Sequence, residues 1–118
     1  MGIVYYSRYL EFFEQARTET LNNINLKIKD LETLGFYLPV IKVECTYLKS
    51  ARLEDIINIR CRIFTIPKSK LRFDYDIYKN VDKLKVASGY TEHAFLNIKK
   101  NKPAKAPTSL LNKIKPYF

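Results

Sequence analysis

The spacing of the apolar residues changes once along this chain of 118 residues, from the period of a helix to the period of a strand. Over residues 7–24 apolar side chains recur every three or four positions, which gathers them on one side of a helix. From residue 36 onward they alternate with polar residues, as in strands that have one covered face and one solvated face. Such a chain has to bury a helical stripe against a sheet.

The helical part is expected to contain two helices. The first covers residues 7–24, with Ser7 suited to its N-cap and a weak point at residues 22–23. The second covers residues 25–34 and should stop at Gly35. The apolar stripe of the first helix consists of Tyr9, Phe12, Phe13, Ala16 and Leu21.

The alternating part predicts four antiparallel strands and a closing helix. Pro103 and Pro107 should end the sheet, and Thr108 should cap the last helix. A long helix followed by antiparallel strands predicts a single α+β domain, residues 1–118, in which a curved sheet wraps around the helix. The expected strands cover residues 40–48, 57–66, 71–78 and 84–98.

Composition excludes several classes of protein. With 47% hydrophobic and 14% aromatic residues the chain is not a disordered tail. No apolar run reaches the ~18 residues of a membrane span, and the N-terminus lacks a secretory signal. We therefore expect a soluble cytoplasmic domain. Cys45 and Cys61 are expected to be reduced, since a disulfide needs an oxidising compartment. Together with His93, the only histidine, they are too few for an ordinary zinc site, so no metal is expected.

The net charge of +9 is concentrated in the second half of the chain. Residues 1–59 carry 7 basic and 8 acidic side chains (net −1), whereas residues 60–118 carry 14 and 4 (net +10). This skew favours an anionic partner, either nucleic acid, an anionic membrane or a phosphate-bearing ligand. The alternative is a general bias of the composition towards lysine. No nucleic-acid-binding motif is present, so nucleic acid is not expected as the partner.

The N-terminal residues carry a specific resemblance. Residues 2–10, GIVYYSRYL, resemble the signature of the 4-hydroxybenzoyl-CoA thioesterase family, and residues 11–19, EFFEQARTE, resemble the helix that follows it. Residues 47–55, 91–93 and 103–107 resemble later segments of that family. The resemblance implies a hotdog fold and hydrolysis of an acyl-CoA to free acid and CoA, without a cofactor. It also implies a homodimer or homotetramer, because a lone hotdog leaves edge strands and half a site exposed.

The chain departs from the family pattern at three places. The family's catalytic Asp, three residues before the glycine that is Gly2 here, is absent together with its strand. Tyr6 stands where relatives often have His, and Arg8 where they have Asn or Ser. One interpretation is a chain that begins too late, with Met1 a misplaced start. The other is an inactive hotdog protein that binds acyl-CoA or serves as an assembly partner.

The resemblance also implies the site residues. A backbone N–H of Tyr6, Ser7 or Arg8, at the start of the helix, would polarise the thioester carbonyl. Gly2 would let the backbone approach the substrate. The motif residues assigned to catalysis are Gly2, Tyr5, Tyr6, Ser7 and Tyr9, and for the three tyrosines packing between helix and sheet is the alternative.

Two further groups of candidates complete the site. Glu14, or Glu11 beside it, could replace the missing Asp, although surface glutamates and a Glu14–Arg17 ion pair are the simpler interpretation. His93 shares a strand face with Thr91 and Phe95 and lies either near the substrate or in sheet packing. Basic residues at a strand entrance would bind the phosphates of CoA, unless they are only solvated lysines. This group is Lys68, Ser69, Lys70 and Arg72, with Lys49 and Arg52 as second choice.

Overall fold

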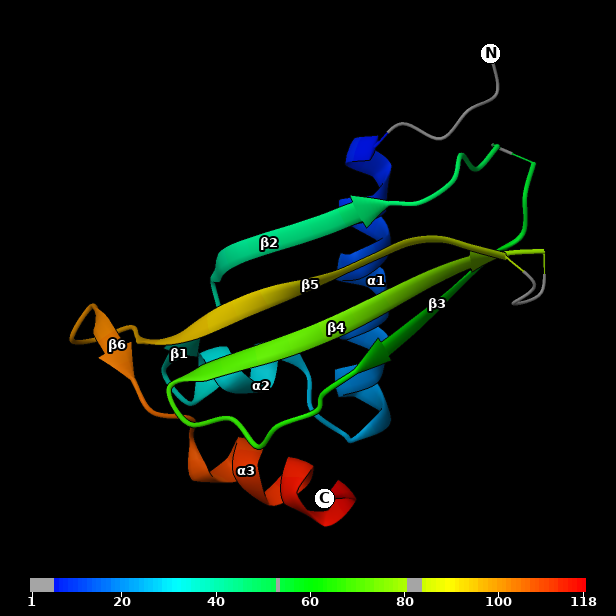
Figure 1. Ribbon diagram of the computed structural model, residues 1–118. Helices are drawn as coiled ribbons and strands as arrows, with labels where there is room; N and C mark the ends of the chain where they lie inside the picture. Colours follow the sequence, from blue (N-terminus) through cyan, green and yellow to red (C-terminus); the bar gives the residue numbers. More distant parts are fainter. Residues whose placement is uncertain (1–5, 53, 81–83) are drawn as a thin grey trace.

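A long helix crosses one face of a curved antiparallel sheet (Figure 1), so the expected α+β architecture is confirmed. The computed structural model describes residues 6–52, 54–80 and 84–118. In chain order its elements are α1 (Tyr6–Asn23), α2 (Ile28–Thr33), β1 (Phe36–Tyr37), β2 (Val40–Tyr47), β3 (Ile57–Arg62), β4 (Lys70–Lys79), β5 (Leu84–Asn97), β6 (Lys102–Ala104), α3 (Thr108–Ile114) and the 3-10 turn η1 (Lys115–Tyr117).

Helix α1 forms close to where the apolar stripe predicts it. It begins at Tyr6, so Ser7 lies within its first turn and not at the N-cap as expected. It ends at Asn23, next to the predicted weak point, and Asn25 then adopts a left-handed backbone with φ 61°. Asparagine tolerates this conformation better than most residues, which explains why the chain can leave the helix here.

Helix α2 is shorter than predicted, Ile28–Thr33 instead of residues 25–34. The Asp30 carboxylate accepts a hydrogen bond from the backbone N–H of Lys27 at 3.2 Å, which fixes the start of the helix. Gly35, with φ 94°, ends it as predicted.

Strand β5 is the centre of the sheet. It pairs antiparallel with β4 on one side and with β2 on the other, and β3 pairs with the far side of β4. The short strands β1 and β6 pair with the last residues of β5, one on each side. Within the part of the chain that the structure describes, β2 and β3 are therefore the edges of the sheet.

Several predicted boundaries are wrong at the ends of strands and helices. The strand expected over residues 57–66 ends at Arg62. Pro103 does not end the sheet but lies within β6, an outer strand where the missing N–H of proline is tolerated. Neither β1 nor β6 was expected, since segments of two or three residues carry no readable alternation. Helix α3 begins at Thr108, so Pro107 occupies the N-cap position that Thr108 was expected to fill.

The core lies between α1 and the concave face of the sheet. The ring of Phe13 stacks on that of Tyr75 with centroids 4.2 Å apart and planes inclined by 11°. Gly89 of β5 lies directly beneath this contact. A Cβ atom at Gly89 would stand 2.1 Å from the carbonyl oxygen of Glu44 in β2 and 3.0 Å from Cζ of Phe13. Only glycine therefore allows the helix and β2 to approach β5 this closely.

None of the helices among the described residues is long and apolar enough to cross a membrane. The cytoplasmic location expected from the sequence stays a prediction.

The close approach at Gly89 predicts a large effect of one added methyl group. We expect Gly89→Ala to lower the free energy of unfolding by about 1–3 kcal/mol, because the methyl forces β2 or α1 away from β5. Urea denaturation followed by circular dichroism measures this. Gly35→Asn is the control, since a Cβ at Gly35 meets nothing within 4 Å and Asn tolerates a positive φ. Equal stability of Gly89→Ala and the wild type would contradict this account of the packing.

Candidate active site

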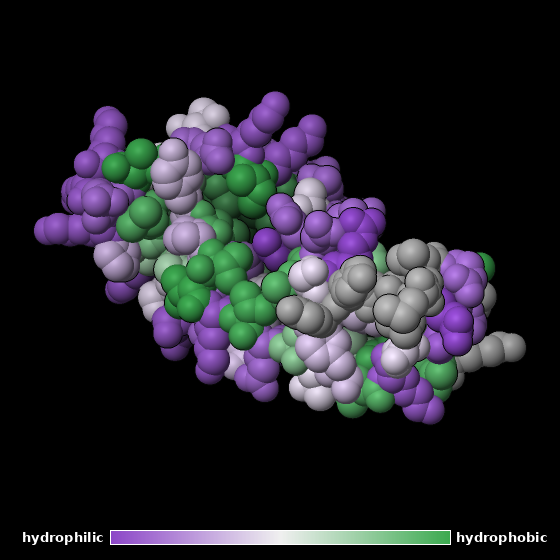
Figure 2. Space-filling model, turned by 90° about the horizontal axis from the view of Figure 1, so that it is seen from above, coloured by the Kyte–Doolittle hydropathy of each residue, from purple (hydrophilic) through white to green (hydrophobic). Residues whose placement is uncertain are grey.

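A groove runs between α1 and the edge strand β2, and we call it the helix–edge groove. It consists of two adjoining cavities of about 260 and 200 Å³ that share Glu14 and Arg17. The outer cavity reaches Val40 and Val43 of β2, and the inner one reaches His93 of β5. Figure 2 views the molecule from the side of β2 and the start of α1, and hydrophobic side chains gather across its middle. The groove thus combines an apolar wall with the carboxylates of Glu11 and Glu14 and the guanidinium of Arg17.

A chain of buried hydrogen bonds forms the floor of the groove. The Tyr75 hydroxyl lies 2.7 Å from Oγ1 of Thr91, which lies 3.0 Å from Nε2 of His93. Nδ1 of His93 lies 3.1 Å from the carbonyl oxygen of Leu38. A carbonyl only accepts, so Nδ1 carries the proton and Nε2 accepts from Thr91. Because the Thr91 hydroxyl donates its only proton to His93, the Tyr75 hydroxyl is the donor in its hydrogen bond with Oγ1 of Thr91.

Burial determines how these groups titrate. Desolvation by burial lowers the pKa of His93, and the positive charge of Arg17 lowers it further. The hydrogen bond to the Leu38 carbonyl acts in the opposite direction and raises this pKa. Desolvation also raises the pKa of Tyr75 to about 12, against lowering by the hydrogen bond to Thr91 and by Arg17. Near neutral pH both side chains are uncharged, which is the state that the hydrogen-bond chain requires.

The N-terminal motif is described only in part. Gly2 and Tyr5 lie outside the described residues, and Tyr6 is the first residue of α1. Ser7 is exposed on the first turn of the helix. Tyr9 is buried, and its ring packs edge-on against those of Phe12 and Tyr47. Tyr9 therefore packs between helix and sheet, which was the alternative interpretation of this residue.

The two glutamates differ in their surroundings. Glu11 forms an ion pair with Arg8 and lines only the outer cavity of the helix–edge groove. Glu14 is exposed but borders both cavities of the helix–edge groove. The expected Glu14–Arg17 ion pair is absent, and both residues belong to the described part of the chain. Arg17 instead lies close to Tyr75 and His93, so its cation faces the floor of the groove.

The predicted CoA-binding residues do not lie in this groove within one chain. Lys68 and Ser69 are exposed on the loop between β3 and β4, and Lys70 begins β4. Arg72 alternates with buried neighbours and so lies on the opposite face of the sheet. There it pairs with Asp74 at 2.9 Å and stacks over the ring of Tyr90, 3.8 Å from its centroid. The second choices, Lys49 and Arg52, are also exposed, in the loop that follows β2.

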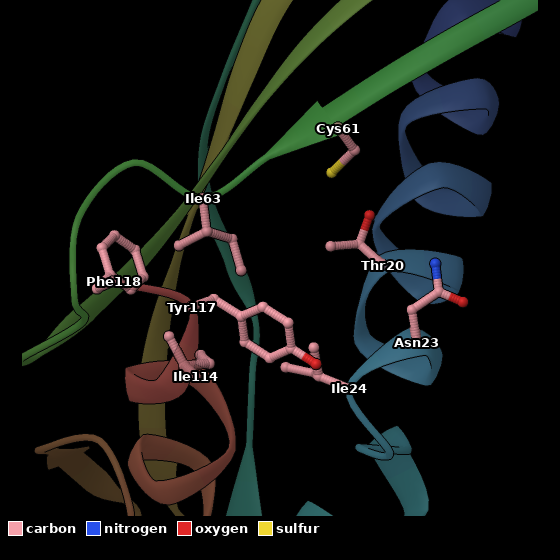
Figure 3. A pocket seen from close by; sticks show the side chains of 8 residues that line it. All are labelled: Thr20, Asn23, Ile24, Cys61, Ile63, Ile114, Tyr117 and Phe118. Carbon is pink, nitrogen blue, oxygen red and sulfur yellow. The ribbon is translucent and has the colours of Figure 1, made fainter.

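A further cavity of about 280 Å³ lies at the other end of α1, between that helix, the end of β3 and α3 (Figure 3). Side chains of Thr20, Ile63 and Tyr117 line it, and the Cys61 thiol points towards it. Burial raises the pKa of Cys61 to about 11, against lowering by a hydrogen bond with Thr20, so the thiol stays protonated near neutral pH. Cys45 and Cys61 are both free. No group of three or more His, Cys, Asp or Glu among the described residues could hold a metal ion.

Sequence reasoning missed the groove although it named most of its residues. Tyr75 and Thr91 occupy inward positions of their strands, and a threonine in an inward stripe signals a buried hydroxyl that needs a partner. The direction of the Arg17 side chain had no such signal, because its spacing from Glu14 also fits a surface pair.

The lowered pKa of His93 predicts how stability depends on pH. Below the unfolded-state pKa of about 6.5 the unfolded chain takes up a proton that the folded protein does not, so the protein loses stability as pH falls from about 7.5 to 5.5. One group contributes at most about 1.4 kcal/mol over this range. Urea denaturation at both pH values should show this loss in the wild type and a smaller one in His93→Gln. Equal pH dependence in both proteins would contradict the prediction.

Comparison with known proteins identifies the family. Residues 1–114 match the thioesterase-like superfamily. The chain is 28% identical over 109 residues to the acyl-CoA thioesterase YbgC of Haemophilus influenzae, which covers 90% of this chain and 77% of that protein.

Two solved structures share the fold. The hypothetical protein TT1821 from Thermus thermophilus gives a TM-score of 0.88 at 24% identity, and the match covers 100% of this chain and 88% of the TT1821 chain. Slr0204, a 1,4-dihydroxy-2-naphthoyl-CoA thioesterase from Synechocystis, gives a TM-score of 0.87 at 21% identity. That match covers 97% of this chain and 84% of the Slr0204 chain. These likenesses confirm the expected hotdog fold. Since the family match spans nearly the whole chain, the protein belongs to the thioesterase-like superfamily and is a homologue of acyl-CoA thioesterases.

Proposed function

We propose that the protein hydrolyses the thioester of an acyl-coenzyme A, with water as the second substrate, and releases a free acid and coenzyme A. Membership of the superfamily and the name of the Haemophilus relative support this activity. The observation that carries the proposal is the helix–edge groove, in which the carboxylates of Glu11 and Glu14 lie beside an apolar wall. The motif over residues 2–10 supports the narrower assignment to the 4-hydroxybenzoyl-CoA thioesterase family.

The reaction needs a donor and a base. The first backbone N–H groups of a helix have no partner within the helix, so those of Tyr6, Ser7 and Arg8 are suited to stabilise the oxyanion that forms on the carbonyl. Glu14 is the candidate base that takes a proton from the attacking water. Collapse of the tetrahedral intermediate then breaks the carbon–sulfur bond, and the CoA thiolate leaves and takes up a proton. His93, uncharged and held at both ring nitrogens, serves the substrate as part of the wall of the inner cavity.

The second candidate function is an inactive hotdog protein that binds acyl-CoA or serves as an assembly partner. It is favoured by the exposure of Glu14, which forms no ion pair within the described residues, and by the packing role of Tyr9. The two functions differ in whether hydrolysis depends on Glu14.

We further propose a homodimer, or a homotetramer built from it, joined along β2. Strand β2 is an edge of the sheet, and an exposed edge offers unpaired backbone groups to a second strand. Val40, Ile41 and Val43 on this strand are more than two-fifths exposed, as is Leu10 on α1. A second copy would cover these apolar side chains and close the helix–edge groove.

Binding of CoA phosphates is proposed for Lys68, Ser69, Lys70 and Arg72. Their exposure supports this assignment, and within the described residues Lys68 and Lys70 form no ion pair, whereas Arg72 already pairs with Asp74. Within one chain they lie outside the groove, so the proposal places the nucleotide end of CoA on the surface and the acyl end in the groove.

Glu14→Gln tests the proposed base. We expect it to lower kcat for acyl-CoA hydrolysis by at least about 100-fold with little change in KM, because the amide cannot accept the proton. Glu19→Gln, on the same helix but outside the groove, should keep wild-type kinetics. Thioester cleavage is followed by release of free thiol. Wild-type kcat in Glu14→Gln would remove Glu14 from the mechanism, and a wild type without activity would favour the second candidate.

Assembly is tested by sedimentation at micromolar concentration. We expect a species of at least twice the 13.9 kDa chain mass, and Val43→Lys should shift it towards the monomer by placing a charge in the joined edge. Phe64→Lys, on the loop after the opposite edge strand, is the matched control and should leave the mass unchanged. A wild type that sediments as a monomer would refute the proposed dimer.

The phosphate contacts are tested by replacing Lys68, Lys70 and Arg72 with Ala together. Exposed charge pairs contribute roughly 1 kcal/mol or less each, so CoA binding should weaken by about 10- to 100-fold. Raising the salt concentration should weaken wild-type binding as well, and CoA lacking its 3′-phosphate should lose less in the triple variant than in the wild type. Unchanged affinity of the triple variant in low salt, measured by calorimetry, would show that these cations do not contact CoA.

A further inference from the structure

Two segments that lie together in the structure contain basic residues and no acidic ones. Residues 63–73 and 95–118 carry nine lysines and arginines in total and no Asp or Glu. The two segments lie together, since the backbone N–H of Ala106 donates to the carbonyl of Lys68 at 2.6 Å. Strand β6 also pairs with β5 next to the start of β4, with Phe95 opposite Ala104 and Ala94 opposite Lys70. We call this part of the molecule the basic end.

The lysines around β6 are free to meet a partner. Lys99, Lys100, Lys102 and Lys105 are all exposed, and within the described residues none of them forms an ion pair with a carboxylate. They lie on the turn before β6, in β6 and directly after it, and hydrophilic side chains crowd this end of the surface, on the left in Figure 2. Four uncompensated cations on one short hairpin attract an extended anionic surface.

The same two segments also expose large apolar side chains. Phe64 and Ile66, in the loop before β4, are 60% and 41% exposed, and Tyr117 and Phe118, after α3, are 69% and 53% exposed. Figure 1 shows this loop above α3 on the lower side of the molecule, running towards the start of β4, with β6 at the left end. Lysines recognise phosphate groups, and aromatic and aliphatic side chains enter the boundary between headgroups and acyl chains. A bilayer with anionic lipids offers both, whereas a partner that presents only anionic groups would leave these apolar side chains in water.

We propose that the basic end docks on the surface of an anionic phospholipid bilayer. Lys99, Lys100, Lys102 and Lys105 contact the headgroup phosphates, while Phe64 and Ile66 enter the interface. The residues proposed to contact the bilayer lie outside the helix–edge groove and outside β2. The basic end also contains Lys68, Lys70 and Arg72, the proposed CoA contacts, and the variants below leave these three residues unchanged.

Flotation with lipid vesicles tests the proposal on the full chain. We expect binding to vesicles of phosphatidylcholine with 30% phosphatidylglycerol at low salt, and none to pure phosphatidylcholine, with the mixture chosen to give about the charge of an anionic membrane. The triple variant K99Q/K100Q/K102Q should bind roughly 10- to 100-fold more weakly. The matched control K42Q/K49Q/K85Q removes the same charge from β2, from the loop after it and from β5, and should bind as the wild type does. Circular dichroism confirms that each variant is folded.

A second variant separates a bilayer from other polyanions. F64S/I66S keeps every charge and should still weaken vesicle binding, because two apolar side chains no longer enter the interface. Its retention on heparin or on a single-stranded oligonucleotide should match that of the wild type. The proposal is overturned if anionic vesicles do not bind, or if both lysine variants lose binding equally. It is also overturned if F64S/I66S binds vesicles as the wild type does, which would indicate a surface for polyanions in general.

Discussion

The structure depends on how closely α1 approaches β5 at Gly89. The ring of Phe13 rests there on Tyr75, and the carbonyl of Glu44 comes so near that no side chain fits at Gly89. This contact sets the height of the helix above the sheet. Glu14 and Arg17, one residue and about one turn further along α1, are thereby carried to the side of β2, and the helix–edge groove follows from a packing constraint in the core.

The floor of the groove is a set of polar groups buried in an apolar core. Thr91, His93 and the hydroxyl of Tyr75 are buried, and buried polar groups destabilise a protein unless they are hydrogen-bonded. Their hydrogen bonds run in one direction, from Tyr75 to the carbonyl of Leu38, just before β2 begins. The network therefore fixes where the edge strand starts as well as satisfying its own members.

The sequence predicted the elements that carry a long periodic pattern. The apolar stripe of α1 and the alternation in β4 and β5 predicted one helix and two strands, because burial on one face is what each pattern encodes. In β2 the same alternation suggested a covered face, yet Val40 and Val43 remain exposed within one chain. The groove could not be predicted, because it depends on the direction of one side chain, Arg17, and the position of the basic residues outside the groove depends on the path of a loop. Neither property produces a periodic pattern in the sequence.

The central place of β5 also has a consequence for how the chain folds. Strands β1, β2 and β4 precede β5 in the sequence, yet each of them pairs with it. During synthesis α1 and β2 therefore emerge long before the strand that joins them, and β3 and β4 can form only a hairpin in the meantime. Contacts between such distant parts of a chain form slowly, because the entropy cost of closing a long loop is met before strand pairing stabilises the contact. Until residue 97 has left the ribosome, the nascent chain carries an apolar helix and an unpaired strand, the state in which a chaperone would meet it.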